Sequence, residues 1–293
     1  MATIRYDQVP LIIQFGKRTE RMIARECSLS EAADLTPIYS IGKYGISEQA
    51  PQGARTASIS FSYSPVLTGL IREDTGETGS YNIINDVANS LKNSKNSQTS
   101  GVSIRFGNIS GEGLLSSYSL SLQPYSPVEC SVNFELFGSG ENLPVSGDLQ
   151  AESPESFKYI NSKLAAQYGH SAHSAFMTAG SPATITSSNE TGILTSVDYS
   201  INFEYEPVYK LGQEFPSSFL YHKANEEANL SENVRETGIA FTGKSENFNL
   251  NIRSLDNQNA ILVKMNEPVL SNTQLRVSSQ GAVETKKPIR SFY

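Results

Sequence analysis

The sequence is poor in the residues that build reactive or cross-linked sites. Its 293 residues include two cysteines, three histidines and no tryptophan. Two cysteines without a CxxC spacing cannot make a disulfide-dense scaffold or the usual zinc site. Cys27 and Cys130 lie in stretches of alternating polarity, where we expect ordinary burial in strands. We therefore expect no metal centre and no cofactor.

Charge is also scarce and unevenly balanced. Charged residues make up 18% of the chain, and the formal net charge is −7. Proteins that grip nucleic acid neutralise phosphates with clustered Lys and Arg, and no such cluster is present. No apolar run approaches the roughly 20 residues that a membrane-spanning helix needs. A protein that grips nucleic acid is disfavoured, and we expect no membrane span.

Short motifs that could carry chemistry have simpler interpretations here. The histidine pair at 170–173 lies in a Ser/Ala-rich stretch without a third ligand nearby. The DTG triplet at 74–76, which also occurs at aspartic protease sites, lies in a polar segment where we predict a turn. The pair Glu226 and Glu227 reads as a solvated helix face. Neither a nucleophile elbow nor a phosphate-binding glycine motif occurs. We therefore predict no catalytic residues and no enzyme activity.

What the sequence has in abundance is strict alternation of polar and apolar residues. Period-2 alternation with β-branched and aromatic residues on one side predicts half-buried β-strands. The residues predicted to pack are Ile59, Phe61, Tyr63, Val132, Phe134, Ile201, Phe203 and Tyr205. Those on the opposite, polar side are Ser58, Ser60, Ser62, Ser131, Asn133, Glu135, Ser200, Asn202 and Glu204. Small polar side chains thus line one face of several strands.

Helices are expected at three places only. Residues 153–168 begin with a capping Ser and a Pro and carry apolar residues at helical spacing. Residues 81–95 show the same spacing, and residues 217–228 show it more weakly. A long turn-rich loop is expected at residues 28–56, where long excursions are usually interaction segments.

The chain also repeats itself. SISFSYSPV at 58–66 returns as SINFEYEPV at 200–208, an offset of 142 residues (200 − 58). A competing echo, PIYSIG at 37–42 and PVYKLG at 207–212, gives an offset of 170 (207 − 37). The first offset is preferred because it also aligns the helices expected at 81–95 and 217–228. It predicts two tandem β domains, at 1–145 and 146–293, the second opening with the helix at 153–168.

These features together resemble the tail tube proteins of bacterial viruses and related contractile injection devices. The residues that carry the resemblance are the alternating strands SISFSYSP, YSLSLQPYSP, CSVNFELFG and YSINFEYEP, with the helix YNIINDVANSL between them. The likeness covers most of the chain and lies in pattern and element order. It implies a mainly β fold in which β-sandwich or split-barrel tube domains each carry a flanking helix.

The resemblance also implies an assembly. Three duplicated chains would form a pseudo-hexameric ring, and stacked rings would form a tube whose inner strands make one continuous β-barrel. The polar side of the strands would face the lumen, where small neutral-to-acidic residues let viral DNA pass without being gripped. Sheath, tape-measure, baseplate or neck proteins would be its other partners. Its place would be the virion tail, assembled in the host cytoplasm.

Two alternatives remain open from the sequence. A baseplate hub, tube initiator or neck component would share the fold but form a single ring. A duplicated β-sandwich that binds carbohydrate or mediates adhesion would also show alternating strands. In that case the polar faces would be the solvated side of an ordinary antiparallel sheet.

Overall fold

The computed structural model shows a mainly β protein built from antiparallel sheets. It describes residues 9–22, 24–32, 35–42, 44–46, 48–51, 56–64, 70–72, 78–79, 83–93, 101–123, 126, 128–137, 144–150, 157–159, 183–187, 192–211, 216, 218–234, 248–253, 259–265, 268–270, 274–276 and 284–292. Those residues include a single helix. Period-2 alternation is thus the dominant signal in the sequence and the dominant structure in the fold.

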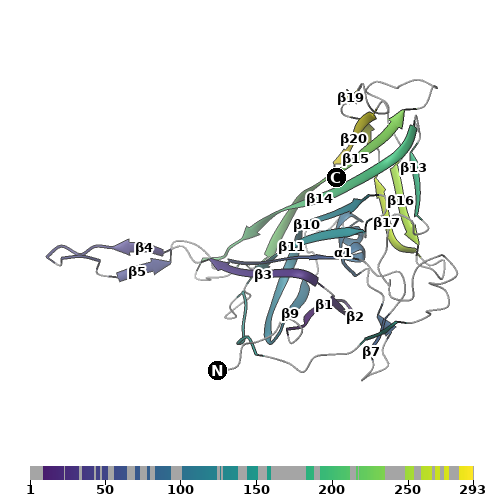
Figure 1. Ribbon diagram of the computed structural model, residues 1–293. Coiled ribbons are helices and arrows are strands. Elements are labelled where there is room, and N and C mark those ends of the chain that lie inside the picture. The colour runs from purple at the N-terminus through teal and green to yellow at the C-terminus, as the bar shows by residue number, and fades with distance from the viewer. Residues whose placement is uncertain are drawn as a thin grey trace.

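One large antiparallel sheet organises the molecule (Figure 1). Its strand order is β18-β20-β15-β14-β10-β11-β6-β3, so the halves of the chain meet where β10 pairs with β14. The strands are β3 (Ala24–Ala32), β6 (Thr56–Tyr63), β10 (Ile109–Leu122), β11 (Glu129–Phe137), β14 (Gly192–Val208), β15 (Ser218–Val234), β18 (Val269–Leu270) and β20 (Glu284–Phe292). Within the described ranges the sheet stays open, with β3 at one edge and the short β18 at the other.

Four further strands, β1, β2, β9 and β19, belong to the same sheet off this path, and the others form smaller sheets. β10 continues past a bulge between Leu115 and Ser117 into a hairpin with β9 (Val102–Phe106). β9 also pairs with β1 (Leu11–Phe15), which pairs with β2 (Arg18–Met22). The remaining strands are β4 (Leu35–Ile38), β5 (Glu48–Pro51), β7 (Leu70–Arg72), β8 (Thr78–Gly79), β12 (Phe157–Tyr159), β13 (Ala183–Ser187), β16 (Phe248–Arg253), β17 (Asn259–Met265) and β19 (Gln274–Arg276).

A single apolar core lies on one face of the large sheet. It draws on both halves of the chain, because Phe134, Tyr118 and Ile201 belong to the same cluster as Phe248 and Ile289. The helix α1 (Ile83–Asn93) contacts β1, β10 and β17 and inserts Ile83, Ile84, Val87 and Leu91 into this core. The helix expected at 81–95 is therefore confirmed, and its apolar stripe is the buried one.

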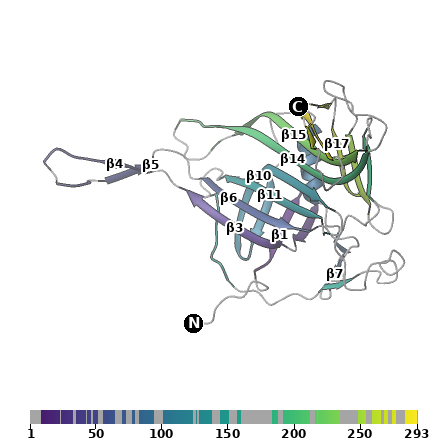
Figure 2. The ribbon, with the colours of Figure 1, turned by 45° about the horizontal axis from the view of Figure 1, so that its top comes forward.

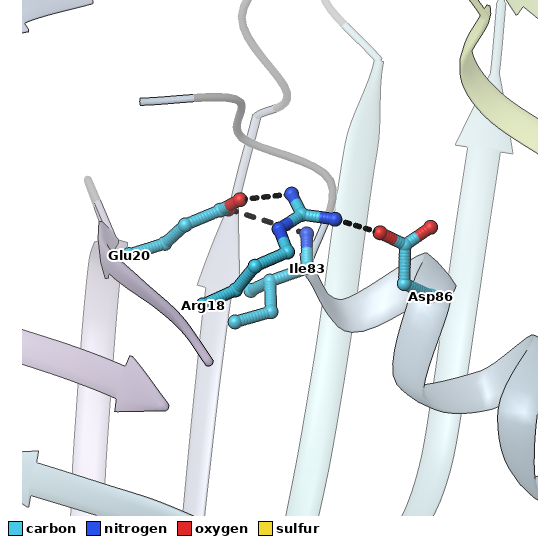
Figure 3. Close-up of polar contacts among 4 residues, drawn as sticks. All are labelled: Arg18, Glu20, Ile83 and Asp86. Carbon is cyan, nitrogen blue, oxygen red and sulfur yellow. Dashed lines mark hydrogen bonds and ion pairs between the residues drawn. The ribbon is translucent and has the colours of Figure 1, made fainter. Parts of the chain in front are cut away.

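The N-terminus of α1 is capped by a side chain from another element (Figure 3). Glu20 on β2 is buried, and its Oε2 accepts a hydrogen bond from the backbone N–H of Ile83 at 3.2 Å. Arg18 bridges Glu20 to Asp86 in the first helical turn. Carboxylates at a helix N-terminus satisfy unpaired N–H groups and complement the helix dipole. This cluster fixes α1 to the β1–β2 hairpin.

Replacing Glu20 with alanine should therefore weaken the protein through its helix cap. Loss of a side-chain cap costs about 1–2 kcal/mol, to which the loss of a partner for Arg18 adds little because that side chain is partly exposed. Chemical denaturation followed by circular dichroism would measure this. Glu20→Gln keeps an oxygen acceptor for the Ile83 N–H and should recover more than half of the loss. Equal destabilisation by both variants would argue against the capping role.

Three expected elements are corrected by the structure. Residues 217–228 are not helical, because β15 spans Ser218–Val234 as a strand. Its Ala and Glu residues favour helices in isolation, but Ala224, Glu226, Ala228 and Leu230 alternate with exposed or half-buried residues, and sheet packing overrides the propensity. Residues 28–56 are not a loop, since they hold the end of β3 and the β4–β5 hairpin. In the helix expected at 153–168, Phe157–Tyr159 form strand β12 and the rest lies outside the described residues.

The β4–β5 hairpin forms an arm that projects away from the body of the molecule (Figures 1 and 2). It extends the β3–β6 pair, whose ladder ends at Ala32 and Thr56. The described part of the chain holds no helix with the length and apolar character needed to cross a membrane.

Candidate functional site

The face of the large sheet opposite the core is continuously polar. Strand register places the polar residues of seven neighbouring strands in rows that run across the sheet. One row is Glu26, Ser62, Ser131, Ser119, Ser200, Glu227 and Arg290. The next row is Ser28, Ser60, Asn133, Ser117, Asn202 and Asn225, and it reaches Phe292 on β20. We call this surface, from β3 to β20, the polar face.

The residues expected on the polar side of the strands all lie on the polar face. Ser60, Ser131, Glu135, Asn202 and Glu204 are exposed, and Ser58, Ser62, Asn133 and Ser200 are half-buried. Of the residues expected to pack, all but one lie in the core at 5% exposure or less: Ile59, Phe61, Tyr63, Val132, Phe134, Ile201 and Phe203. The exception, Tyr205, is half-buried and donates a hydrogen bond to the Leu115 carbonyl.

Sequence reasoning missed several members of the polar face. Ser28 and Ser30 on β3 fell in the supposed loop, although their alternation with Cys27 and Leu29 was a usable signal. Asn225 and Glu227 on β15 were assigned to a helix. Ser28 and Ser30 exchange hydroxyl hydrogen bonds with Ser60 and Ser58 at 2.7 and 2.8 Å, so the polar face starts at the edge strand β3.

Basic side chains on this face lie against carboxylates. Arg25 contacts Glu129 at 2.5 Å, reaching from β3 to β11. Arg290 lies 3.3 Å from Glu227, and Lys223 lies 3.4 Å from Glu204. These ion pairs are solvent-exposed and contribute little to stability. Their consequence is electrostatic, because each of these basic charges is neutralised locally. Lys286 on β20, opposite Ser231, is a further exposed base, and the carboxylates Glu26, Glu135 and Asp198 outnumber it.

The buried side of the same wall holds an ion pair that the sequence did not predict. Glu226, expected on a solvated helix face, is 1% exposed and points into the core from β15. Its Oε1 accepts hydrogen bonds from the Lys92 ammonium at 2.6 Å and from the Tyr199 hydroxyl at 2.5 Å. Lys92 also donates to the Lys264 carbonyl at 2.6 Å. This buried cluster joins α1 to β14, β15 and β17.

The thiols are not poised for chemistry. Burial raises the pKa of Cys27 to about 12 and that of Cys130 to about 12, so both stay protonated near neutral pH. In the described residues no group of three or more His, Cys, Asp or Glu side chains could hold a metal ion. The arrangement therefore provides a broad, exposed and acidic surface on one face of the large sheet.

Comparison with known proteins does not assign the chain to a family. No protein-family model matches the chain, and no curated protein matches it significantly.

Proposed function

We propose that the protein is a structural subunit of a viral tail tube, in which the polar face lines a channel that conducts DNA. The observation that carries this proposal is the continuity of the polar face across both halves of the chain. The rows pass from β11 and β10 of the first half to β14 and β15 of the second without interruption. Any antiparallel sheet with one buried face places its polar residues in rows, so the support lies in the extent of this surface, which crosses seven strands and both halves of the chain.

The open edges of the large sheet support assembly by strand pairing. A nine-residue edge strand such as β3 presents unpaired backbone groups that invite another strand. The proposed neighbour is the opposite edge of a second chain, near β18 and β19. If three chains each contribute the eight strands of the main path, they supply 24 strands, more than the 16–18 strands that already enclose an aqueous channel. Closure into a ring would remove the exposed edges.

We further propose that the halves are copies whose offset varies along the chain, near 170 at β3 and β6, rather than being fixed at 142. The preferred offset relied on a helix at 217–228, which is strand β15. Equivalent pairings support a shared topology with an offset that changes along the chain. The offset is near 170 for β3 and β6, but β9 and β16 begin 146 residues apart (248 − 102) and β11 and β20 begin 155 apart (284 − 129). β3 pairs with β6 and β6 with β11, as β14 pairs with β15 and β15 with β20. Likewise β1 pairs with β9 as β13 pairs with β16. The β10–β14 junction would then be the intrachain counterpart of the junction between chains.

The assembly is tested by the mass and shape of purified full-length protein. Sedimentation velocity and electron microscopy are expected to show three-chain rings with pseudo-sixfold symmetry, alone or stacked as tubes. Isolated rings that never lengthen would favour the hub, initiator or neck position. A protein that remains monomeric at all concentrations would contradict the proposal.

The electrostatic character of the lumen gives a second test. Ser60 lies in the middle of a polar row between Ser28 and Asn133, so Ser60→Lys should fold and assemble but retain DNA. Fluorescence anisotropy of duplex DNA added to assembled protein should show binding at low salt that falls steeply as salt rises. Ser60→Gln, which is long but uncharged, should resemble the wild type. A Ser60→Lys protein that cannot fold would show that the polar face is misassigned.

A further inference from the structure

The exposed apolar side chains of the protein are concentrated at two hairpin ends. Of the ten large apolar residues that are exposed in the described ranges, seven lie there. Five belong to the arm and two follow β14: Ile38, Tyr39, Ile41, Tyr44, Ile46, Tyr209 and Leu211. Ile41, Tyr44 and Leu211 are as exposed as in an extended chain, at 108%, 106% and 105%. Concentrated apolar exposure of this kind marks an interaction surface.

The two ends carry the same short sequence. PIYSIG in the arm and PVYKLG, which begins with the last two residues of β14, share Pro, a β-branched residue, Tyr, an aliphatic residue and Gly at matching positions. In both, the apolar residues at the third and fifth positions of the motif are exposed. The motif makes no contribution to the core of this chain. Its recurrence at the ends of both the β3–β6 and the β14–β15 hairpins therefore indicates a shared binding role.

Both hairpins end on the same side of the large sheet. Phe137 pairs with Thr56, where the β3–β6 ladder ends, and its ring lies 4.3 Å from that of Phe219 near the start of β15. The arm and the β14–β15 pair extend in the same direction in Figures 1 and 2. A two-stranded hairpin such as β4–β5 is only marginally stable by itself, so the arm needs a surface to pack on.

We infer that both ends are matched docking elements for a second copy of this chain, with Ile41 and Tyr44 in one and Tyr209 and Leu211 in the other as apolar anchors. Two elements that share a motif on one molecule are best bound by a partner that carries two similar binding surfaces. A chain whose halves repeat the same strand pairings is such a partner. Because the ends project from one side only, the contact is head-to-tail and propagates along an axis. The inference rests on the proposed function, to which it adds that the short second tip binds as well as the long arm.

Matched variants at the short tip separate apolar docking from charge. Leu211→Ser removes an anchor, whereas Lys210→Ser changes the exposed neighbouring residue to the same side chain. Ile41→Ser makes the equivalent change in the arm. All three positions are exposed, so circular dichroism and thermal unfolding should match those of the wild type. Sedimentation velocity and electron microscopy would then measure ring formation and ring stacking separately.

The expected result is that rings form in every variant. Stacking should weaken at least about tenfold in Leu211→Ser and in Ile41→Ser, because each loses most of the burial of an aliphatic side chain, and should persist in Lys210→Ser. Stacking that is equal in Leu211→Ser and Lys210→Ser, or wild-type rings that never stack, would overturn the inference and leave the ring proposal standing. Absence of rings in the wild type would instead reject the proposed function and this inference with it.

Discussion

Phe61→Asp is expected to prevent the protein from folding. Phe61 is 4% exposed, its ring is stacked on Phe134 at 6.3 Å, and it lies in the core of the large sheet. Removing a buried phenylalanine costs about 3–5 kcal/mol. Burying an unpaired carboxylate adds several kcal/mol more. The sum approaches the total stability of about 5–15 kcal/mol that a typical protein has, so circular dichroism should show no cooperative unfolding transition.

The neighbouring residue supplies the control for that substitution. Ser60 is adjacent on β6 but faces the polar side, so Ser60→Asp should change the free energy of unfolding by only about 0.5 kcal/mol. The contrast tests which face of β6 is packed. A folded Phe61→Asp protein, or a Ser60→Asp protein that is equally damaged, would contradict the assignment of the two faces.

The second large effect is expected at the buried ion pair. Lys92 and Glu226 have side-chain exposures of 4% and 0%, so removing one leaves the other as an uncompensated charge in the core. Lys92→Met should therefore cost about 3–5 kcal/mol, and Glu226→Gln a similar amount. The Glu226→Gln side chain still offers an oxygen to the Tyr199 hydroxyl, which isolates the effect of charge.

The double variant distinguishes charge burial from simple loss of contacts. Lys92→Met combined with Glu226→Gln removes both charges, and its free energy of unfolding should lie within about 2 kcal/mol of the wild type. Urea denaturation of the wild type, both single variants and the double variant would give the coupling energy. Additive losses in the double variant would mean that the two residues stabilise the protein independently.

Local pattern was sufficient to predict the strands that carry the polar face in the middle of the sheet. β6, β11 and the part of β14 from Tyr199 to Tyr205 alternate strictly, and the packed residues predicted there are buried apart from Tyr205, which is half-buried. The stripe of Ile84, Val87 and Leu91 likewise predicted α1. In these elements the spacing of apolar residues in the sequence matches the buried face, so the elements could be predicted without knowledge of their long-range contacts.

β15 could not be predicted from local pattern because its composition and its environment disagree. Ala224 and Ala228 flank Glu226 on the buried side and leave space for the Lys92 side chain from α1. A segment with Glu between two alanines has a high helix propensity, so it is predicted to be helical as long as the buried partner of the Glu is unknown. The partner lies 134 residues away in the chain, and no local signal points to it.

The order of the strands in the large sheet was the second feature that could not be predicted from the sequence. β10 pairs with β14, and β15 pairs with β20. Nothing in the local sequence of these strands indicates which strand each one pairs with. Both internal echoes are present in the sequence, and neither one alone shows which strands pair with which. The rows of the polar face depend on this register, because a one-residue slip would turn every side chain to the opposite face.

The most direct test of the channel is a cryo-electron microscopy reconstruction of the assembled protein at side-chain resolution. We predict a three-chain ring in which β3 of one chain pairs near β18 and β19 of the next. Ser60, Ser119 and Ser200 should lie on the wall of an enclosed lumen, with Phe61 and Ile201 sealed behind it. A closed particle that carries these three serines on its outer surface, or in which β3 pairs with no other chain, would contradict it.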